Sequence, residues 1–386
     1  AAGLDRLAPP KRILLLEALG DRGDREATAA VLAQAQRGEA NVRVAALRAL
    51  ARLGDAAAVA PLMDLAAGDV PEVAQAAAAA LAALPGKDVD AAVQAFLGSS
   101  NAKLRRTAIE VLGQRRVVAA APALLQAAAD ADPSIRLSAV KALGEIGGQE
   151  VVPVMVALLL KASSAEDRAA IEAALAAACA GATDRDACVA ALAPAMASAN
   201  AEAKTPVLRT LGRLGGAEAL KAVRAALQDP SEAAREAAVR ILAEWADPSA
   251  SGDLAALARS TQNKAHKILA LRGYIRLIAQ GNPSPDQKLA ACKEALSLAD
   301  RDEERKLVLG VLGGVPRVDA LTIVSPLLAQ PGTRDEAAAA AVAIAEKIVG
   351  GHASQVADAM KQVLAATGNP ELQQRAKEVL RRAGGK

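Results

Sequence analysis

The sequence predicts an all-α protein built as a right-handed α-solenoid of about eleven or twelve stacked helix pairs. Three observations support this fold class: the composition, a repeat of nearly fixed length, and a helical period of apolar residues inside each repeat. Of the 386 residues 102 are Ala, whereas Phe, Trp and Tyr occur once each. Ala favours closely packed helices, and sheets prefer the aromatic residues that this chain lacks. A charged share of 23% with a net charge of only +3 excludes a disordered charged tail.

The repeat is marked by one aliphatic anchor near the end of a helix in each unit. The anchors lie 31 to 36 residues apart, at Leu19, Leu50, Leu81, Leu112, Leu143, Leu175, Leu211, Leu242, Leu277, Leu312, Ile344 and Leu380. No segment has the composition of a linker. We therefore expect residues 1–386 to form a single continuous solenoid, with less regular units from about residue 165 onward.

Each unit has the same internal order. In residues 42–50 the apolar side chains recur three and four positions apart, which predicts an amphipathic first helix that ends at the anchor. A turn that often contains Gly follows, as at residues 53–55, and then a second apolar helix such as residues 57–67. We assign the glycines to these turns, and the extra residues of the longer units to the loops 246–252 and 281–286.

A cation stands seven residues before the anchor in eight of the twelve units. We call this set the basic ladder; its members are Arg12, Arg43, Arg105, Arg136, Arg168, Lys204, Arg235 and Arg305. On stacked identical helices these side chains would form a row along one side of the array. We expect them to tie each unit to the acidic side chains or carbonyls of its neighbour. The alternative is a stripe that binds phosphates.

The pattern of Val-Arg, Ala and Leu-Gly in residues 41–54 and 135–144 resembles the HEAT repeat, and more narrowly the HEAT-like subtype first described in phycobilin lyases. The resemblance covers essentially the whole chain and implies a solenoid. Residues 270–277 and 303–310 are similar to exported HEAT-repeat proteins of environmental bacteria. Because the start resembles the tail of an earlier unit, we expect the chain to be a piece of a longer array.

The sequence predicts no catalytic, cofactor or metal site, and we do not expect an enzyme. His266 and His352 lie in different units, and neither has a Cys or carboxylate at metal-ligand spacing. Trp245 and Tyr274 are the only candidate aromatics for a bilin pocket, and we expect Trp245 to lie in the core of its unit. The longest apolar run, residues 151–160, is too short to span a bilayer.

The expected function is a non-catalytic protein–protein interaction scaffold. The concave face, usually lined by the second helices, would hold a protein partner or another module of the same polypeptide. Nucleic acid is not expected, because the second helices at 56–67, 88–97, 118–129, 150–160 and 185–196 carry only one cation, Arg185. The alternatives are a bilin-lyase-like or other enzyme accessory protein, and a structural subunit of a larger extracellular assembly.

Two cysteines flank one predicted turn. Cys179 lies near the end of a helix over 167–180, and Cys188 lies one turn into the next helix. Antiparallel helices 8–10 Å apart can bring such residues within disulfide range, so we predict a Cys179–Cys188 disulfide and a free Cys292. Two free core thiols are the alternative. A disulfide would indicate an exported protein, periplasmic or extracellular; otherwise the protein is cytoplasmic.

Overall fold

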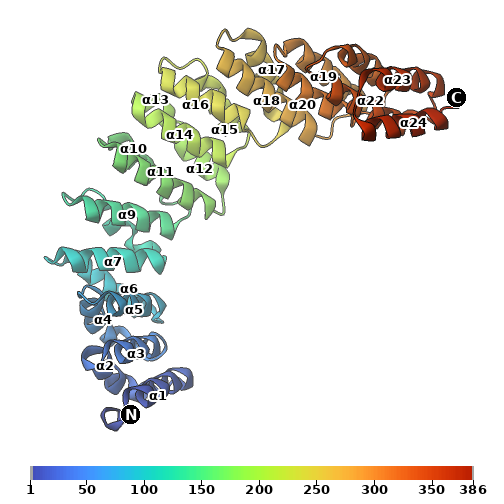
Figure 1. The fold of residues 1–386 in the computed structure, drawn as a ribbon. Coiled ribbons are helices and arrows are strands. Elements are labelled where there is room, and N and C mark those ends of the chain that lie inside the picture. The colour runs from blue at the N-terminus through green and yellow to red at the C-terminus, as the bar shows by residue number, and fades with distance from the viewer. Residues whose placement is uncertain (1–2, 385–386) are drawn as a thin grey trace. The chain divides into compact units, whose positions relative to one another are not determined.

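The structure, a computed structural model that describes residues 3–384, is helical throughout and contains no strand within that range. The chain divides into two compact units, unit 1 up to Leu214 and unit 2 from Gly215 onward. In both units helices alternate along the chain between first helices, which end near the anchors, and second helices (Figure 1). The predicted all-α solenoid is therefore confirmed, whereas a single continuous array stays a prediction.

Unit 1 contains six complete helix pairs and a final first helix within its described part. Its first helices are α1 (Pro9–Arg22), α3 (Ala40–Leu53), α5 (Pro71–Ala83), α7 (Ala102–Gln114), α9 (Pro133–Ile146), α11 (Ala165–Ala180) and α14 (Ala201–Leu214). The second helices are α2 (Thr28–Arg37), α4 (Val59–Ala66), α6 (Lys87–Gln94), α8 (Ala121–Ala127), α10 (Val152–Lys161) and α12 (Arg185–Leu192), which α13 (Ala195–Ser198) follows. Several second helices begin or end with a 3₁₀ turn, such as η4 (Ala95–Gly98).

Unit 2 begins with a second helix and continues in the same alternation through its described residues. Its first helices are α16 (Glu232–Ala243), α18 (Lys264–Gln280), α20 (Asp302–Leu312), α22 (Arg334–Ile348) and α24 (Pro370–Arg382). Its second helices are α15 (Ala217–Ala226), α17 (Ser251–Ser260), α19 (Pro285–Leu298), α21 (Val318–Val324) and α23 (Ala353–Ala366).

The polar joints between units set where the first helices begin. The side chain of Asn101 accepts a hydrogen bond from the backbone N–H of Lys103 at 2.9 Å, and Asn263 accepts one from the N–H of Ala265 at 2.9 Å. Ser164 caps α11 in the same way. These side chains satisfy N–H groups that have no partner inside the helix, so the starts of α7, α11 and α18 are encoded locally.

First helices of neighbouring repeats approach each other through small residues. A Cβ atom added to Gly113 in α7 would lie 2.8 Å from the Cα atom of Ala142 in α9. Gly144 in α9 meets Ala174 in α11 in the same manner, at 2.9 Å. The assignment of all glycines to turns is therefore wrong. Some of them lie inside helices, at points where the next helix leaves no room for a side chain.

The sequence register is also wrong in one unit. The residues of the basic ladder lie four positions after the N-cap of their helix and seven positions before the anchor. In α18 the N-cap is Asn263, so Lys267 occupies the ladder position of that helix. Tyr274, rather than Leu277, therefore occupies the anchor position of that helix. The loop predicted at 246–252 is largely helical, because a 3₁₀ turn covers Pro248–Ala250 and α17 starts at Ser251. The second predicted loop is confirmed over residues 281–284.

Candidate functional site

Six arginines of the basic ladder donate hydrogen bonds to backbone carbonyl groups in the segment that precedes their own helix. Nη1 of Arg136 donates to the backbone oxygens of Asp130 and Ala131, at 3.1 and 3.0 Å. Arg168 donates to Ala162 O at 3.0 Å. The same kind of bond to a carbonyl five to eight residues earlier is made by Arg12, Arg43, Arg105 and Arg235. Most of these carbonyls lie in the joint after the second helix, as Asp130 lies beyond the end of α8 at Ala127, so the guanidinium groups fasten that joint to the first helix. Arg43 instead reaches Ala35 O in the last turn of α2.

Three ladder arginines also reach forward to an acidic side chain of the next unit. The pairs are Arg105–Asp130 at 3.7 Å, Arg136–Asp167 at 3.6 Å and Arg168–Glu202 at 2.7 Å. Arg305 bonds Asp302 of its own helix at 3.2 Å, and Lys204 occupies the corresponding position of α14. The positive charge of these three arginines is thus balanced by carboxylates of the protein itself, which leaves little of it to attract a phosphate.

The position of the ladder is occupied by Lys267 in α18 and by the uncharged Gln373 in α24. Each lies four residues after its N-cap, and the Gln373 side chain donates to Thr367 O at 2.8 Å. The anchor count missed Lys267 because α18 is longer than the other first helices. The N-cap Asn263 was the sequence signal that would have found it.

Pockets occur beside the basic ladder, between the first helices of successive repeats. One of about 410 Å³ in unit 1 is lined by Arg136, Val140, Leu158 and Asp167. In unit 2, a pocket of about 400 Å³ lies between α16 and α18, and another of about 310 Å³ lies between α18 and α20. The two pockets of unit 2 lie one repeat apart and offer concave, partly apolar surface.

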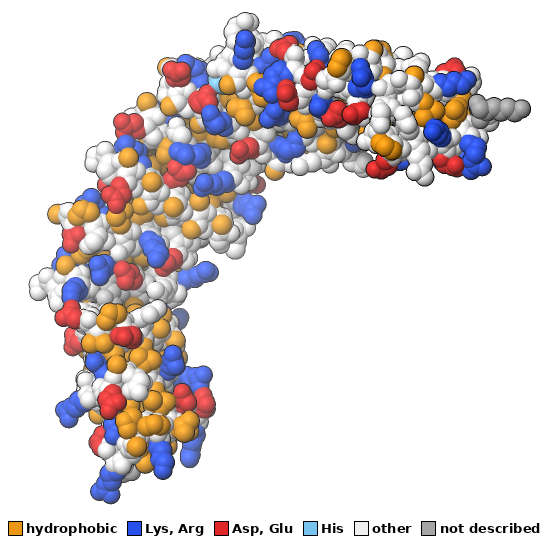
Figure 2. Space-filling view, in the orientation of Figure 1, with side chains coloured by type: hydrophobic (Ala, Val, Ile, Leu, Met, Phe, Trp, Pro, Cys, Tyr) orange, Lys and Arg blue, Asp and Glu red, His pale blue; other side chains and the backbone are white. Residues whose placement is uncertain are grey.

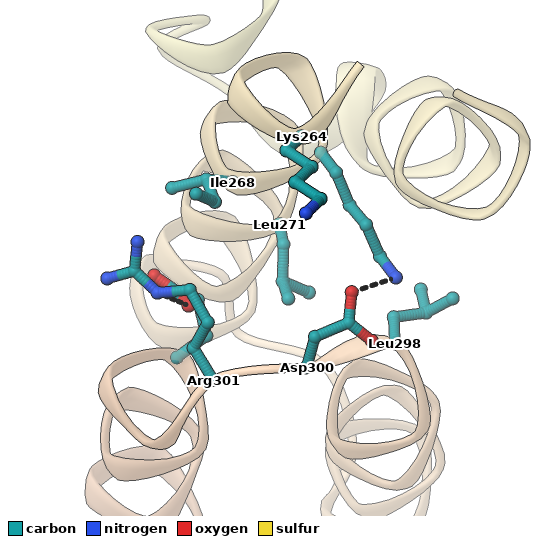
Figure 3. A pocket seen from close by; sticks show the side chains of 8 residues that line it. Lys264, Ile268, Leu271, Leu298, Asp300 and Arg301 are labelled. Carbon is teal, nitrogen blue, oxygen red and sulfur yellow. Dashed lines mark hydrogen bonds and ion pairs between the residues drawn. The ribbon is translucent and has the colours of Figure 1, made fainter. Parts of the chain in front are cut away.

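The pocket between α18 and α20 combines an apolar floor with charged side chains. Ile268, Leu271 and Leu298 form the floor. In Figure 3, Lys264 points into the pocket from α18, and Asp300 and Arg301 lie across from it on the segment that leads into α20.

Two sets of ion pairs hold the walls of this pocket. Lys267 Nζ lies 2.6 Å from Asp300 Oδ2. Glu304 is only 2% exposed, and its two oxygens accept from Arg272 Nε at 2.9 Å and Arg301 Nε at 3.2 Å. A buried carboxylate needs such compensation. In the sequence, Glu304 is indistinguishable from the acids that commonly open a helix, because Arg272 comes from the preceding first helix.

The structure brings Cys179 and Cys188 together as free thiols. Both are buried, and Sγ of Cys188 donates to the backbone oxygen of Asp184 at 3.5 Å. Burial raises the pKa of Cys179 to about 12 and raises the pKa of Cys188 as well. The disulfide and the export that depends on it stay predictions. Cys292 is a fully buried thiol, as expected.

Both candidate aromatics serve packing. Trp245 is 2% exposed and donates from Nε1 to Asp247 at 3.2 Å, which confirms its predicted place in the core. Tyr274 donates its hydroxyl to Glu294 at 2.9 Å, and burial raises its pKa. Of the histidines, His266 pairs with Glu236, and His352 precedes α23.

Among residues 3–384, no three His, Cys, Asp or Glu side chains are grouped so as to hold a metal ion. No helix in that range has the length and apolar content needed to cross a membrane.

Comparison with solved structures supports the same architecture. The chain is 12% identical to the karyopherin Kap121p in its complex with the SUMO protease Ulp1p, with a TM-score of 0.52 over 92% of this chain and 45% of that one. The Kap121p complex with the extreme C-terminus of the protein phosphatase Cdc14p matches at 12% identity and a TM-score of 0.51, with the same coverage. The chain therefore spans less than half the length of Kap121p.

A weaker likeness links the chain to the CpcE–CpcF complex of phycocyanin lyase from Nostoc sp. PCC7120. The identity is 22% and the TM-score 0.30, over 58% of this chain and 94% of that one, which is too low to bear on activity. None of the curated protein sequences matches the chain. The model of the HEAT repeats matches residues 2–82, 89–176 and 184–273, more than half of the sequence. The chain therefore belongs to the HEAT-repeat family.

Proposed function

We propose that this chain is a non-catalytic scaffold that holds a segment of a partner protein, and that unit 1 receives the segment in a groove between α3 and α5. HEAT-repeat solenoids are typical of protein-binding scaffolds. The groove is the observation that carries the proposal, because it joins an apolar floor to a polar rim, the anatomy of protein interfaces.

The floor of the groove follows from the sequence of α5. Residues 76–80 are all Ala, so beyond Gln75 the groove-lining residues of α5 carry only methyl groups. Next to α3 this leaves a hollow of about 640 Å³, whose floor includes Val44, Ala51, Ala76 and Ala79. Figure 2 shows hydrophobic side chains gathered over α2 to α5 on one side of unit 1.

The rim of the groove offers polar groups to a partner. Arg48, Glu72 and Gln75 line it and are exposed. None of the three makes an ion pair or side-chain hydrogen bond within the described part of the chain. Such groups can pair with a partner without first breaking contacts inside the fold.

The surface of the second helices, where the sequence predicts that the partner binds, offers fewer side chains for a partner to contact. On α4 and the turn before it, Ala57, Ala60 and Asp64 are exposed. These short side chains present few groups that could fix the orientation of a partner. A partner segment is therefore better accommodated between the first helices, and the second-helix face becomes the comparison surface of the test.

The test begins with a pull-down from native extract in which the bound proteins are identified by mass. Binding of the purified partner is then measured for Ala76→Glu/Ala79→Glu in the groove and for Ala57→Glu/Ala60→Glu on the second-helix surface. We expect the groove variant to bind at least roughly tenfold more weakly, because a carboxylate would be desolvated against an apolar floor. The second-helix variant should bind like the wild type.

Melting curves check that both variants stay folded. Loss of binding in the second-helix variant alone would transfer the site to the face expected from the sequence. Unchanged binding in both variants would show that neither surface receives the partner, and the proposed site would be wrong.

A further inference from the structure

The pocket between α18 and α20 has an excess of positive charge. The cations in or beside it are Lys264, Lys267, Arg272 and Arg301, and the carboxylates are Asp300, Glu303 and Glu304. Each of these charges has a partner except Lys264, which makes no ion pair or side-chain hydrogen bond within residues 3–384. Its ammonium group points into the pocket (Figure 3).

Lys264 also stands at an unfavourable place in its helix. It is the first residue of α18, a helix of 17 residues with no acidic residue in its first turn. The N-terminus of a helix carries partial positive charge, which favours anions and disfavours a cation there. A carboxylate from a ligand would interact favourably with both Lys264 and the helix end.

The apolar floor adds a second requirement. Ile268 and Leu298 are half-buried, and Leu271 lies beneath them with 2% exposure. A cavity of about 310 Å³ can accept one aliphatic side chain together with a neighbouring carboxylate. An inorganic anion would leave this floor in contact with water.

The neighbouring pocket of unit 2, one repeat away, repeats the apolar floor but not the unpaired cation. Val239 and Leu257 line it, whereas its Arg235 donates to the backbone oxygens of Asp229 and Pro230. Asp253 also lines this pocket. The adjacent residues His266 and Lys267 each line one of the two pockets. Packed helices lie about 8–10 Å apart, and a polyproline II segment returns the same face every three residues, after about 9 Å.

We infer that this edge of unit 2 binds an extended, acidic segment of a partner protein. Aliphatic residues three positions apart enter the two pockets, and a carboxylate enters the pocket between α18 and α20. The inference rests on the proposed scaffold function, because it specifies the chemistry of a protein partner. The carboxylate contacts Lys264, and the aliphatic side chain covers Ile268 and Leu271.

The probe is a fluorescein-labelled peptide of about twelve residues that repeats the triplet Leu-Glu-Pro, which favours the polyproline II conformation. Anisotropy with the full chain measures its affinity. Lys264→Glu should weaken binding roughly tenfold or more, because an attraction becomes a repulsion. The matched control is Lys293→Glu on α19. This lysine is also exposed and lies outside the pocket, so its variant should bind within about twofold of the wild type.

Two further probes separate charge from apolar contact. Replacing every Glu of the peptide by Gln, or every Leu by Ser, should each reduce the affinity roughly tenfold. Equal binding of the Gln peptide, or equal loss with Lys264→Glu and Lys293→Glu, would overturn the inference. If the peptide fails to bind while the groove variant of unit 1 still loses its native partner, this inference is wrong and the scaffold function stands.

Discussion

The close approach of α7 and α9 predicts that Gly113→Ala destabilises the protein, although Ala is the better helix former. Inside a helix this exchange should by itself stabilise by about 1 kcal/mol. Here, however, the new Cβ atom would lie 2.8 Å from both the Cα and the Cβ atom of Ala142. Ordinary contact begins at 3.4 Å, so the two helices would have to separate by about 0.6 Å. Overpacking of this kind costs about 1–3 kcal/mol, so after the gain of about 1 kcal/mol we expect a net loss of up to about 2 kcal/mol.

Gly310→Ala is the matched control. Gly310 also lies inside a first helix, α20, but no atom lies within 4 Å of its added Cβ. This variant should gain about 1 kcal/mol. Thermal melting and hydrogen exchange measure both effects, and in Gly113→Ala the lost protection should centre on α7 and α9, because repeat proteins open locally. A Gly113→Ala protein as stable as Gly310→Ala would refute the reasoning.

Three other perturbations test separate parts of the molecule. The hydrogen bond from His266 lowers the pKa of Glu236, so its stabilising contribution is complete above the ordinary Glu pKa of about 4.3 and is lost as the pH falls through the lowered value. Melting curves should therefore show the deficit of Glu236→Gln shrinking on acidification, and a growing deficit would contradict this. Thiol counting in denaturant without reductant should find one reactive thiol if Cys179 and Cys188 are bonded, whereas three would remove both the disulfide and the export prediction. Limited proteolysis should cut first at residues 281–284, which are not helical, and an initial cut inside α9 would contradict the register.

The repeat could be predicted from the sequence because its signals are local. Anchors such as Leu112 and Leu143 recur at nearly constant spacing, and the structure buries both completely. N-caps such as Asn101 and Ser164 act within three residues of themselves, so they mark helix starts without knowledge of the fold. A structural role of the basic ladder could be predicted for the same reason, because most of its carbonyl partners lie five to eight residues earlier in the chain.

The candidate sites depended on contacts between residues about thirty positions apart. The alanine run of α5 predicts only a helix, and it becomes a groove because α3 lies beside it. Glu304 looks like an ordinary first-turn acid until Arg272, on the preceding first helix, is placed against it. Gly113 belongs to an interface between helices for the same reason. Local propensity and period thus determined the helices and their order, whereas hollows, buried charges and close backbone contacts arise only where two helices meet, and the tertiary structure alone decided those.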